Sequence, residues 1–163
     1  RVGPALPRRE AGLDVQRRIF LAVLHGKRVR IHYLSMNSPK ASWRWIRPHA
    51  FGHDGYRWHA RAWNEETGDF RDFVLSRMQS ADWPEEDAPL PALDTAWETW
   101  ETLSLVPNPA LSKEQQAAVQ EDYGLQSGRL VLHVRKAMLP YTLDHLRLPN
   151  SRWEGKPFMV VEG

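Results

Sequence analysis

The sequence of 163 residues contains no cysteine. Disulfides, thiolate catalysis and zinc sites built on sulfur are therefore excluded. It also has no apolar run near the roughly 18 residues that span a bilayer, and no segment that resembles a cleavable signal at its start. Together these absences predict a soluble, cytoplasmic protein with no membrane partner.

The charge is distributed unevenly along the chain. The formal net charge is only +2, yet residues 27–77 carry a large share of the arginine, while residues 82–101 are acidic and contain several prolines. This asymmetry predicts a basic binding half followed by an acidic connector. Because the sequence begins with Arg1 rather than methionine, we expect a fragment that lacks an N-terminal segment.

The first half predicts a helix followed by four antiparallel strands. Apolar residues recur at helical spacing over residues 13–27, with Asp14 as the expected cap and Gly26 as the expected end. Alternating apolar and polar residues then predict strands separated by short turns. These strands cover residues 28–35, 42–51, 56–63 and 70–78. Short antiparallel strands of this kind favour a compact, strongly bent barrel.

The second half has a β-α-β-α pattern. A strand over residues 99–109 precedes a helix over 111–124, in which Ser112 and Gln115 have the spacing of a capping box. A strand over 128–135 precedes a last helix over 136–148, with Pro140 in its first turn or at a kink. The predicted fold class is α+β. The predicted divisions are a tail (1–12), a barrel (13–82), a connector (83–101) and a smaller α/β extension (102–163).

The strand that begins at Tyr56 combines cations with aromatic rings. Residues two apart share a face, so the pattern predicts Arg57, His59, Arg61 and Trp63 on one side, with Trp58, Ala60 and Ala62 packed in the core on the other. We interpret Arg57, next to the turn, as solvated. Arg71 and Arg77 on the following strand would join this cationic face.

Guanidinium groups bind phosphate oxygens through paired hydrogen bonds, and aromatic rings stack on bases. Gathering cations on one face costs free energy unless an anion joins them, so the pattern indicates a ligand that carries phosphate. The alternative is a solvated sheet face in which each arginine is balanced by neighbours such as Asp54, Asp69 and Asp72.

The sequence offers little for an enzyme. His49 and His53 have the i, i+4 spacing of metal ligands on a helix, but Pro48 and Gly52 argue against a helix there. Ser35 with a histidine and an aspartate could form a triad, although no glycine pattern of a nucleophile elbow accompanies it. We therefore predict no catalysis, no metal and no cofactor.

Several motifs in one order resemble a known family. VRIHYLS, IRPHAF, GYRWHARAW and GDFRDFVLSRM, over about residues 14–80, resemble the WYL domain of bacterial transcriptional regulators, an Sm-like, SH3-type small barrel. LSLVPNPALSKEQQAAVQEDYG and GRLVLHVRKAMLPYTLDHLRL resemble the C-terminal extension called WCX. The similarity is greatest to repressors found beside phage-defence genes. The name-giving Trp-Tyr-Leu triplet corresponds to Trp58, His59 and Ala60, so only the tryptophan is retained.

This resemblance implies a ligand sensor that controls an N-terminal winged helix-turn-helix, which nothing before Leu13 could form. Its expected effector is a single nucleic acid strand or a nucleotide, and duplex DNA would be bound only through the missing domain. The implied ligand-binding residues are Tyr33, Ser35, His49, His59, Arg61, Trp63, Arg71, Phe73 and Arg77, with Trp63 and Phe73 as stacking surfaces. Asp72 would orient an arginine.

The resemblance also implies that the C-terminal half forms a homodimer. Arg129 and Arg135 would then reach the ligand pocket of the partner protomer. A competing hypothesis treats the chain as an interaction and dimerisation module with no small ligand, in which Trp97 and Trp100 are packing or interface residues.

Overall fold

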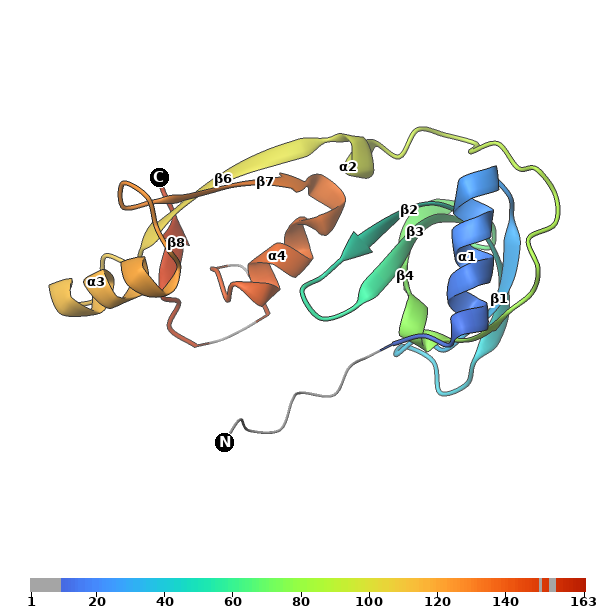
Figure 1. Ribbon diagram of the computed structural model, residues 1–163, viewed down its shortest axis with the longest axis horizontal. Helices are drawn as coiled ribbons and strands as arrows, with labels where there is room; N and C mark the ends of the chain where they lie inside the picture. Colours follow the sequence, from blue (N-terminus) through green and yellow to red (C-terminus); the bar gives the residue numbers. More distant parts are fainter. Residues whose placement is uncertain (1–9, 150, 153–154) are drawn as a thin grey trace. The chain divides into compact units, whose positions relative to one another are not determined.

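The computed structural model describes residues 10–149, 151–152 and 155–163. The chain divides into two compact units, here called unit 1, which ends at Leu93, and unit 2, which runs from Asp94 to Gly163 (Figure 1). Across the described ranges, no helix is long and apolar enough to cross a membrane.

Unit 1 is a helix packed on a five-stranded antiparallel sheet (Figure 1). Its elements are α1 (Leu13–His25), β1 (Val29–Tyr33), β2 (Ser42–His53), β3 (Trp58–Asn64), β4 (Asp69–Val74), the 3₁₀-helix η1 (Leu75–Arg77) and β5 (Met78–Ala81). The helix and the first three predicted strands are confirmed. The fourth predicted strand is wrong beyond Val74, because the chain turns through η1 there and continues as a separate strand, β5.

The strand order is β4-β3-β2-β1-β5, so β4 and β5 are the two edges of the sheet. A helix on an antiparallel sheet agrees with the predicted α+β class. The expected closed barrel is not present, because β5 pairs with β1 and β4 pairs with β3, and the two edges are not paired with each other.

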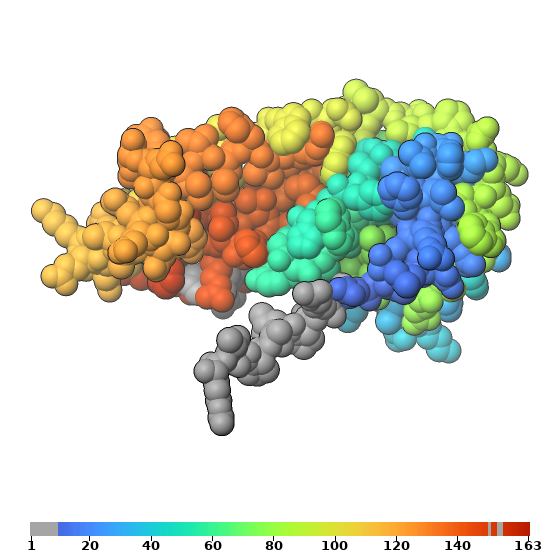
Figure 2. Space-filling view, viewed as in Figure 1, coloured from blue at the N-terminus to red at the C-terminus, as the bar shows by residue number. Residues whose placement is uncertain are grey.

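Helix α1 covers one face of this sheet. Val15, Ile19 and Ala22 are buried and pack in one cluster with Ile31 and Ile46 of the strands. Figure 2 shows the outer side of α1, in blue, at the surface of unit 1. The helix therefore packs on the sheet through its buried apolar side chains and exposes its other side, as expected for an amphipathic helix.

The ends of α1 differ in how well they were predicted. Gly26 ends the helix with φ of +65°, a conformation that glycine adopts without steric cost, so this prediction is confirmed. Asp14 is not the cap, because Gly12 occupies the cap position and Asp14 lies in the first turn. A carboxylate in the first turn still stabilises the helix through its favourable interaction with the helix dipole.

The first part of the acidic connector is attached to unit 1. The amides of Asp82, Glu85 and Ala88 donate to the carbonyls of Arg30, Arg28 and Gly26, over 2.8, 3.2 and 3.0 Å. Acidic side chains of the connector also pair with basic ones beside β1, over 2.8 Å between Arg30 and Asp82 and 3.2 Å between Lys27 and Asp87. Residues 82–88 thus continue the pairing of β5 along β1 and neutralise its cations.

Unit 2 contains a three-stranded antiparallel sheet with strand order β7-β6-β8. Its elements are α2 (Thr95–Glu98), β6 (Trp100–Pro107), α3 (Lys113–Asp122), β7 (Leu130–Arg135), the 3₁₀-helix η2 (Lys136–Met138), α4 (Leu139–His145) and β8 (Met159–Val161). The predicted β-α-β-α elements are confirmed, including the capping box of Ser112 and Gln115 and the place of Pro140 in a first turn. The sequence did not predict α2 or β8.

Candidate functional site

Strand β3 is buried on both of its faces. Ala60 and Ala62 are fully buried in the cluster beneath α1. His59 and Arg61 point to the opposite face and are only 2% and 8% exposed. The sheet face that carries His59, Arg61 and Trp63 is called the Arg61 face below. A guanidinium group this well buried is uncommon and has to be balanced by polar or anionic partners.

The register of β3 and β4 decides which residues join this face. Arg61 lies opposite Asp72 and Trp63 lies opposite Phe70, so Asp72 and Phe70 belong to the Arg61 face. Arg71 lies opposite Ala62 and therefore projects to the other side of the sheet. The prediction that Arg61 and Arg71 share a face is wrong.

Arg71 has a local partner instead. Its Nε donates to Asp69 over 2.9 Å, and both side chains are about half exposed. The hydrogen bond from Arg71 and the one from Thr67 lower the pKa of Asp69, while the carboxylate raises the pKa of Arg71. This arrangement is an ordinary surface ion pair beside a turn.

Tyr33 and Phe73 belong to the hydrophobic core. Their rings meet edge to face with centroids 5.1 Å apart, and the Tyr33 hydroxyl accepts a hydrogen bond of 3.0 Å from the amide of Val74. Phe73 is 2% exposed, so its ring has no free face on which a base could stack. Their implied place in the ligand site is not retained.

Ser35 and Arg77 also lie outside strands β3 and β4, which carry the Arg61 face. The Ser35 hydroxyl accepts from the amide of Asn37 in the turn after β1. Arg77 lies in η1 rather than in a strand, and its carbonyl accepts from the amide of Leu34. Of the nine implied ligand residues, the Arg61 face retains His49, His59, Arg61 and Trp63.

Aromatic rings surround part of this face. Phe70 meets Trp63 with centroids 5.1 Å apart and meets His49 at 5.5 Å, both edge to face. His49 reaches this position because the register of β2 and β3 shifts between Pro48 and Ala50, at a bulge. Phe70 is not among the residues predicted for the site, although the sequence shows its alternation with Asp72.

Asp54 is the electrostatic centre of the turn between β2 and β3. Its Oδ2 lies 2.7 Å from His59 Nε2 and 3.1 Å from Arg57 Nε. Burial alone would raise the pKa of Asp54. The hydrogen bonds from His59 and from the amides of Tyr56 and Arg57 outweigh it and lower the pKa to about 2. Arg57 is thus a half-buried partner of Asp54, which corrects its interpretation as solvated.

Arg61 has a carboxylate on the same face, because its Nη1 lies 3.4 Å from Asp72 Oδ1. This contact agrees with the orienting role expected of Asp72. Three arginines of this region therefore each have an aspartate beside them: Arg57 with Asp54, Arg61 with Asp72 and Arg71 with Asp69. Repulsion between the arginines is relieved within the fold, so it no longer demands an anionic ligand.

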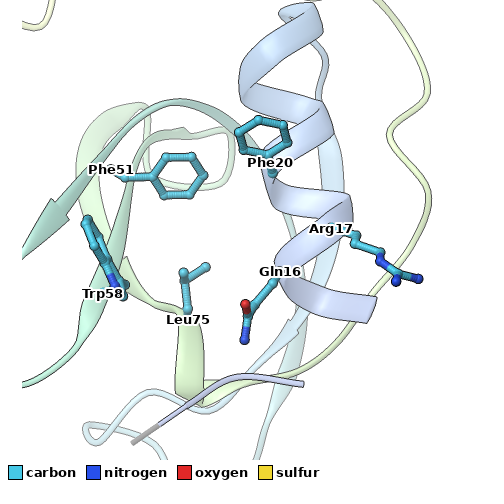
Figure 3. Close-up of a pocket in the computed structure, with 6 residues that line it drawn as sticks. All are labelled: Gln16, Arg17, Phe20, Phe51, Trp58 and Leu75. Carbon is cyan, nitrogen blue, oxygen red and sulfur yellow. The ribbon is translucent and has the colours of Figure 1, made fainter. Parts of the chain in front are cut away.

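An apolar cavity of about 500 Å³ lies between α1 and the sheet of unit 1 (Figure 3). Its lining residues are Gln16, Arg17, Phe20, Phe51, Trp58 and Leu75. Trp58 is 54% exposed, so its predicted place in the core is wrong. It lies opposite His53 where β3 begins, and in Figure 3 its ring borders the open space between Phe51 and Leu75.

The two arginines implied in unit 2 have different surroundings. Arg129 forms an ion pair of 3.1 Å with Glu162 on the surface. Arg135 donates to the carbonyl of Trp97 over 2.7 Å, and its guanidinium lies 4.6 Å from the ring of Trp97 and 4.4 Å from that of Trp100. Trp97 is buried, whereas Trp100 is 57% exposed.

The two units correspond to two protein-family models. Residues 14–82 match the WYL domain, and residues 100–161 match the domain described as "BrxR transcriptional regulator, C-terminal dimerization domain". The chain therefore contains a WYL domain followed by a domain of the BrxR dimerization type, and the second match supports a homodimer.

Its relatives give a more particular description. Three of them, from Escherichia coli strain KTE188, Stenotrophomonas maltophilia and Pseudomonas aeruginosa, are each described as "DNA-binding transcriptional repressor CapW". Their sequence identities to this chain are 36%, 40% and 31%. The aligned regions cover 94%, 88% and 96% of this chain, respectively. The chain spans only about half of their length, 52%, 48% and 52%.

A solved structure, the proteasome accessory factor B/C of Arthrobacter aurescens, is 20% identical, with a TM-score of 0.44 over 82% of this chain and 23% of its own.

Proposed function

We propose that this chain is the effector-sensing and dimerisation region of a bacterial transcriptional repressor of the phage-defence-associated branch. The observation that carries the proposal is the Arg61 face, where a guanidinium that is 8% exposed lies on one sheet face with Trp63, Phe70 and His49. Relatives of about twice the length are described as DNA-binding repressors. Contact with duplex DNA is therefore assigned to a part of the protein outside this chain.

The effector proposed for this face is a nucleic acid strand or a nucleotide. A phosphate would accept hydrogen bonds from Arg61 in competition with Asp72, whose contact of 3.4 Å is long for a strong ion pair. The rings of Trp63, Phe70 and His49 offer contact surfaces for a base. Binding would alter the balance between two conformations of the dimer, which the DNA-binding part would detect.

The test is a binding titration of the chain with fluorescent single-stranded DNA, single-stranded RNA, and mono- and cyclic nucleotides at low and high salt. We expect Arg61→Ala to weaken binding at least about 10-fold, because an arginine–phosphate hydrogen bond is charge-assisted. Arg71→Ala is the matched control, since Arg71 lies on the other side of the same hairpin. Binding should also weaken as salt rises.

Two results would contradict the proposal. One is failure of every probe to bind at low salt. The other is an equal loss from Arg61→Ala and Arg71→Ala, which would indicate general electrostatic attraction without a site on the Arg61 face. Circular dichroism and thermal melts of both variants separate loss of binding from loss of folding.

A second candidate function is supported by the ion pairs of unit 1. Because Arg57, Arg61 and Arg71 each have an aspartate beside them, these cations are balanced within the fold without any ligand. The chain would then serve as an interaction and dimerisation module, and its melting temperature would be unchanged by every nucleotide or oligonucleotide.

A further inference from the structure

Within the described part of unit 2, helices α3 and α4 pack on one face of the sheet. Leu103 and Leu105 of β6 are buried in a cluster with Leu111 and Val119 of the α3 region and with residues of α4. Side chains that alternate with them on β6 point the other way, and the first of these, Trp100, is 57% exposed. A small unit that buries one sheet face and leaves much of the other exposed has an incomplete core.

The bare side is called the open face. It consists of Trp100, Thr102, Ser104 and Val106 of β6, Val131, His133 and Arg135 of β7, and Val160 of β8. The pairing of the strands places Trp100 opposite Arg135, Thr102 opposite His133 and Ser104 opposite Val131. These residues therefore form a continuous surface across all three strands.

Polar groups on the open face have partners within unit 2. The Thr102 hydroxyl lies 3.0 Å from His133 Nδ1, and the guanidinium of Arg135 lies over Trp100. Ser104 donates to Glu162 over 2.8 Å. The exposed parts that remain are largely apolar, with Val131 49% exposed, and engaged polar groups are inexpensive to remove from water.

The helical side of unit 2 has a different surface. Exposed positions of α3 include charged residues such as Lys113, Glu114, Glu121 and Asp122. Flexible charged side chains are depleted at the centres of stable interfaces, where aromatic residues are enriched. The open face thus fits the centre of an interface better than the outer side of α3.

We propose that two copies of this chain pair through their open faces, with the same residues contributed by each copy. The inference rests on the dimerisation part of the proposed function and goes further by naming the surface. The matched dimerization domain, residues 100–161, contains every strand of this sheet. An isologous contact requires a self-complementary patch, and the tryptophan and valines of the open face would supply apolar side chains from both copies.

The first experiment compares two valines of similar exposure on opposite faces of the sheet. Val131 lies opposite Ser104 on the open face, while Val161 lies opposite Leu105 of the core face and is 46% exposed. By analytical ultracentrifugation we expect Val131→Glu to weaken dimerisation at least about 30-fold, because the interface would then bury an unpaired carboxylate. Val161→Glu should leave the dimer within about 3-fold of the parent chain.

A cross-link provides a second test that does not depend on destabilisation. Because the chain has no cysteine, an introduced thiol is the only one present. Ser104 lies in the middle of the central strand, near the expected two-fold axis, so Ser104→Cys should form a disulfide-linked dimer on oxidation. Ala117→Cys, on the exposed side of α3, should not.

The outcomes separate this inference from the proposed function. If the unaltered chain is a monomer at all concentrations, dimerisation itself is refuted. If it is a dimer that Val131→Glu does not weaken, or if Ala117→Cys links and Ser104→Cys does not, then only the assignment to the open face is overturned. Circular dichroism of Val131→Glu checks that the fold is intact, and the cross-link decides the question if it is not.

Discussion

His59 and Asp54 form a buried contact of 2.7 Å between an imidazole nitrogen and a carboxylate oxygen, with both side chains less than 10% exposed. Because the pKa of Asp54 falls from 3.8 to about 2 on folding, its ionised form stabilises the native state. This stabilisation is complete above about pH 4 and is lost as the pH falls toward 2.

Replacing this carboxylate tests the relationship. We expect Asp54→Asn to lower the free energy of unfolding by roughly 2 kcal/mol at pH 7, since hydrogen bonds to a charged group are lost. The difference from the parent chain should shrink as the pH falls below 4. Urea unfolding at several pH values measures both effects. Asp69→Asn, at the exposed pair with Arg71, should cost much less, and an equal cost would contradict this explanation.

The exposed Trp58 and the buried Phe73 should differ in their contribution to stability. Phe73→Ala removes a ring that is 2% exposed and should cost about 3–5 kcal/mol, the usual cost of deleting a buried aromatic side chain. Trp58→Ala, at a position 54% exposed, should cost less than about 1.5 kcal/mol, because water already reaches the ring. Thermal and urea unfolding of the two variants provide the comparison, and a reversed order would refute the assignment of Trp58 to the cavity wall.

The connector should behave as part of unit 1 in hydrogen exchange. The amides of Asp82, Glu85 and Ala88 donate to unit 1, so they should exchange at least about 10-fold more slowly than in an unfolded peptide. Asp82→Asn removes an ion pair of 2.8 Å with Arg30 whose groups are both more than one-third exposed, and should cost less than about 1 kcal/mol. Exchange of these amides at unfolded rates would show that the connector is detached in solution.

Much of the fold could be predicted from local patterns, because strand alternation and helix capping depend on residues that are close together in the sequence. The capping box of Ser112 and Gln115 and the glycine end of α1 at Gly26 are confirmed for this reason. A closed barrel would require the edge strands β4 and β5 to pair with each other. No local sequence pattern indicates whether they do.

The candidate site was harder to predict because it depends on register. Asn64 pairs with Asp69 across a loop of four residues, so odd-numbered residues of β3 face even-numbered residues of β4. Loop length could therefore have assigned Asp72, rather than Arg71, to the side of Arg61. The exposure of Trp58 depends on how far α1 extends over the sheet. The alternation of residues within one strand does not reveal this.

The attachment of residues 82–88 along β1 also has a mechanical consequence. A pull on the chain from Leu93 would load the hydrogen bonds one at a time, first at Ala88 and Gly26, then at Arg28 and last between Asp82 and Arg30. Hydrogen bonds that are loaded one after another break at a lower force than hydrogen bonds that carry the load together. The connector would thus lengthen in small steps under tension while the sheet of unit 1 stays folded.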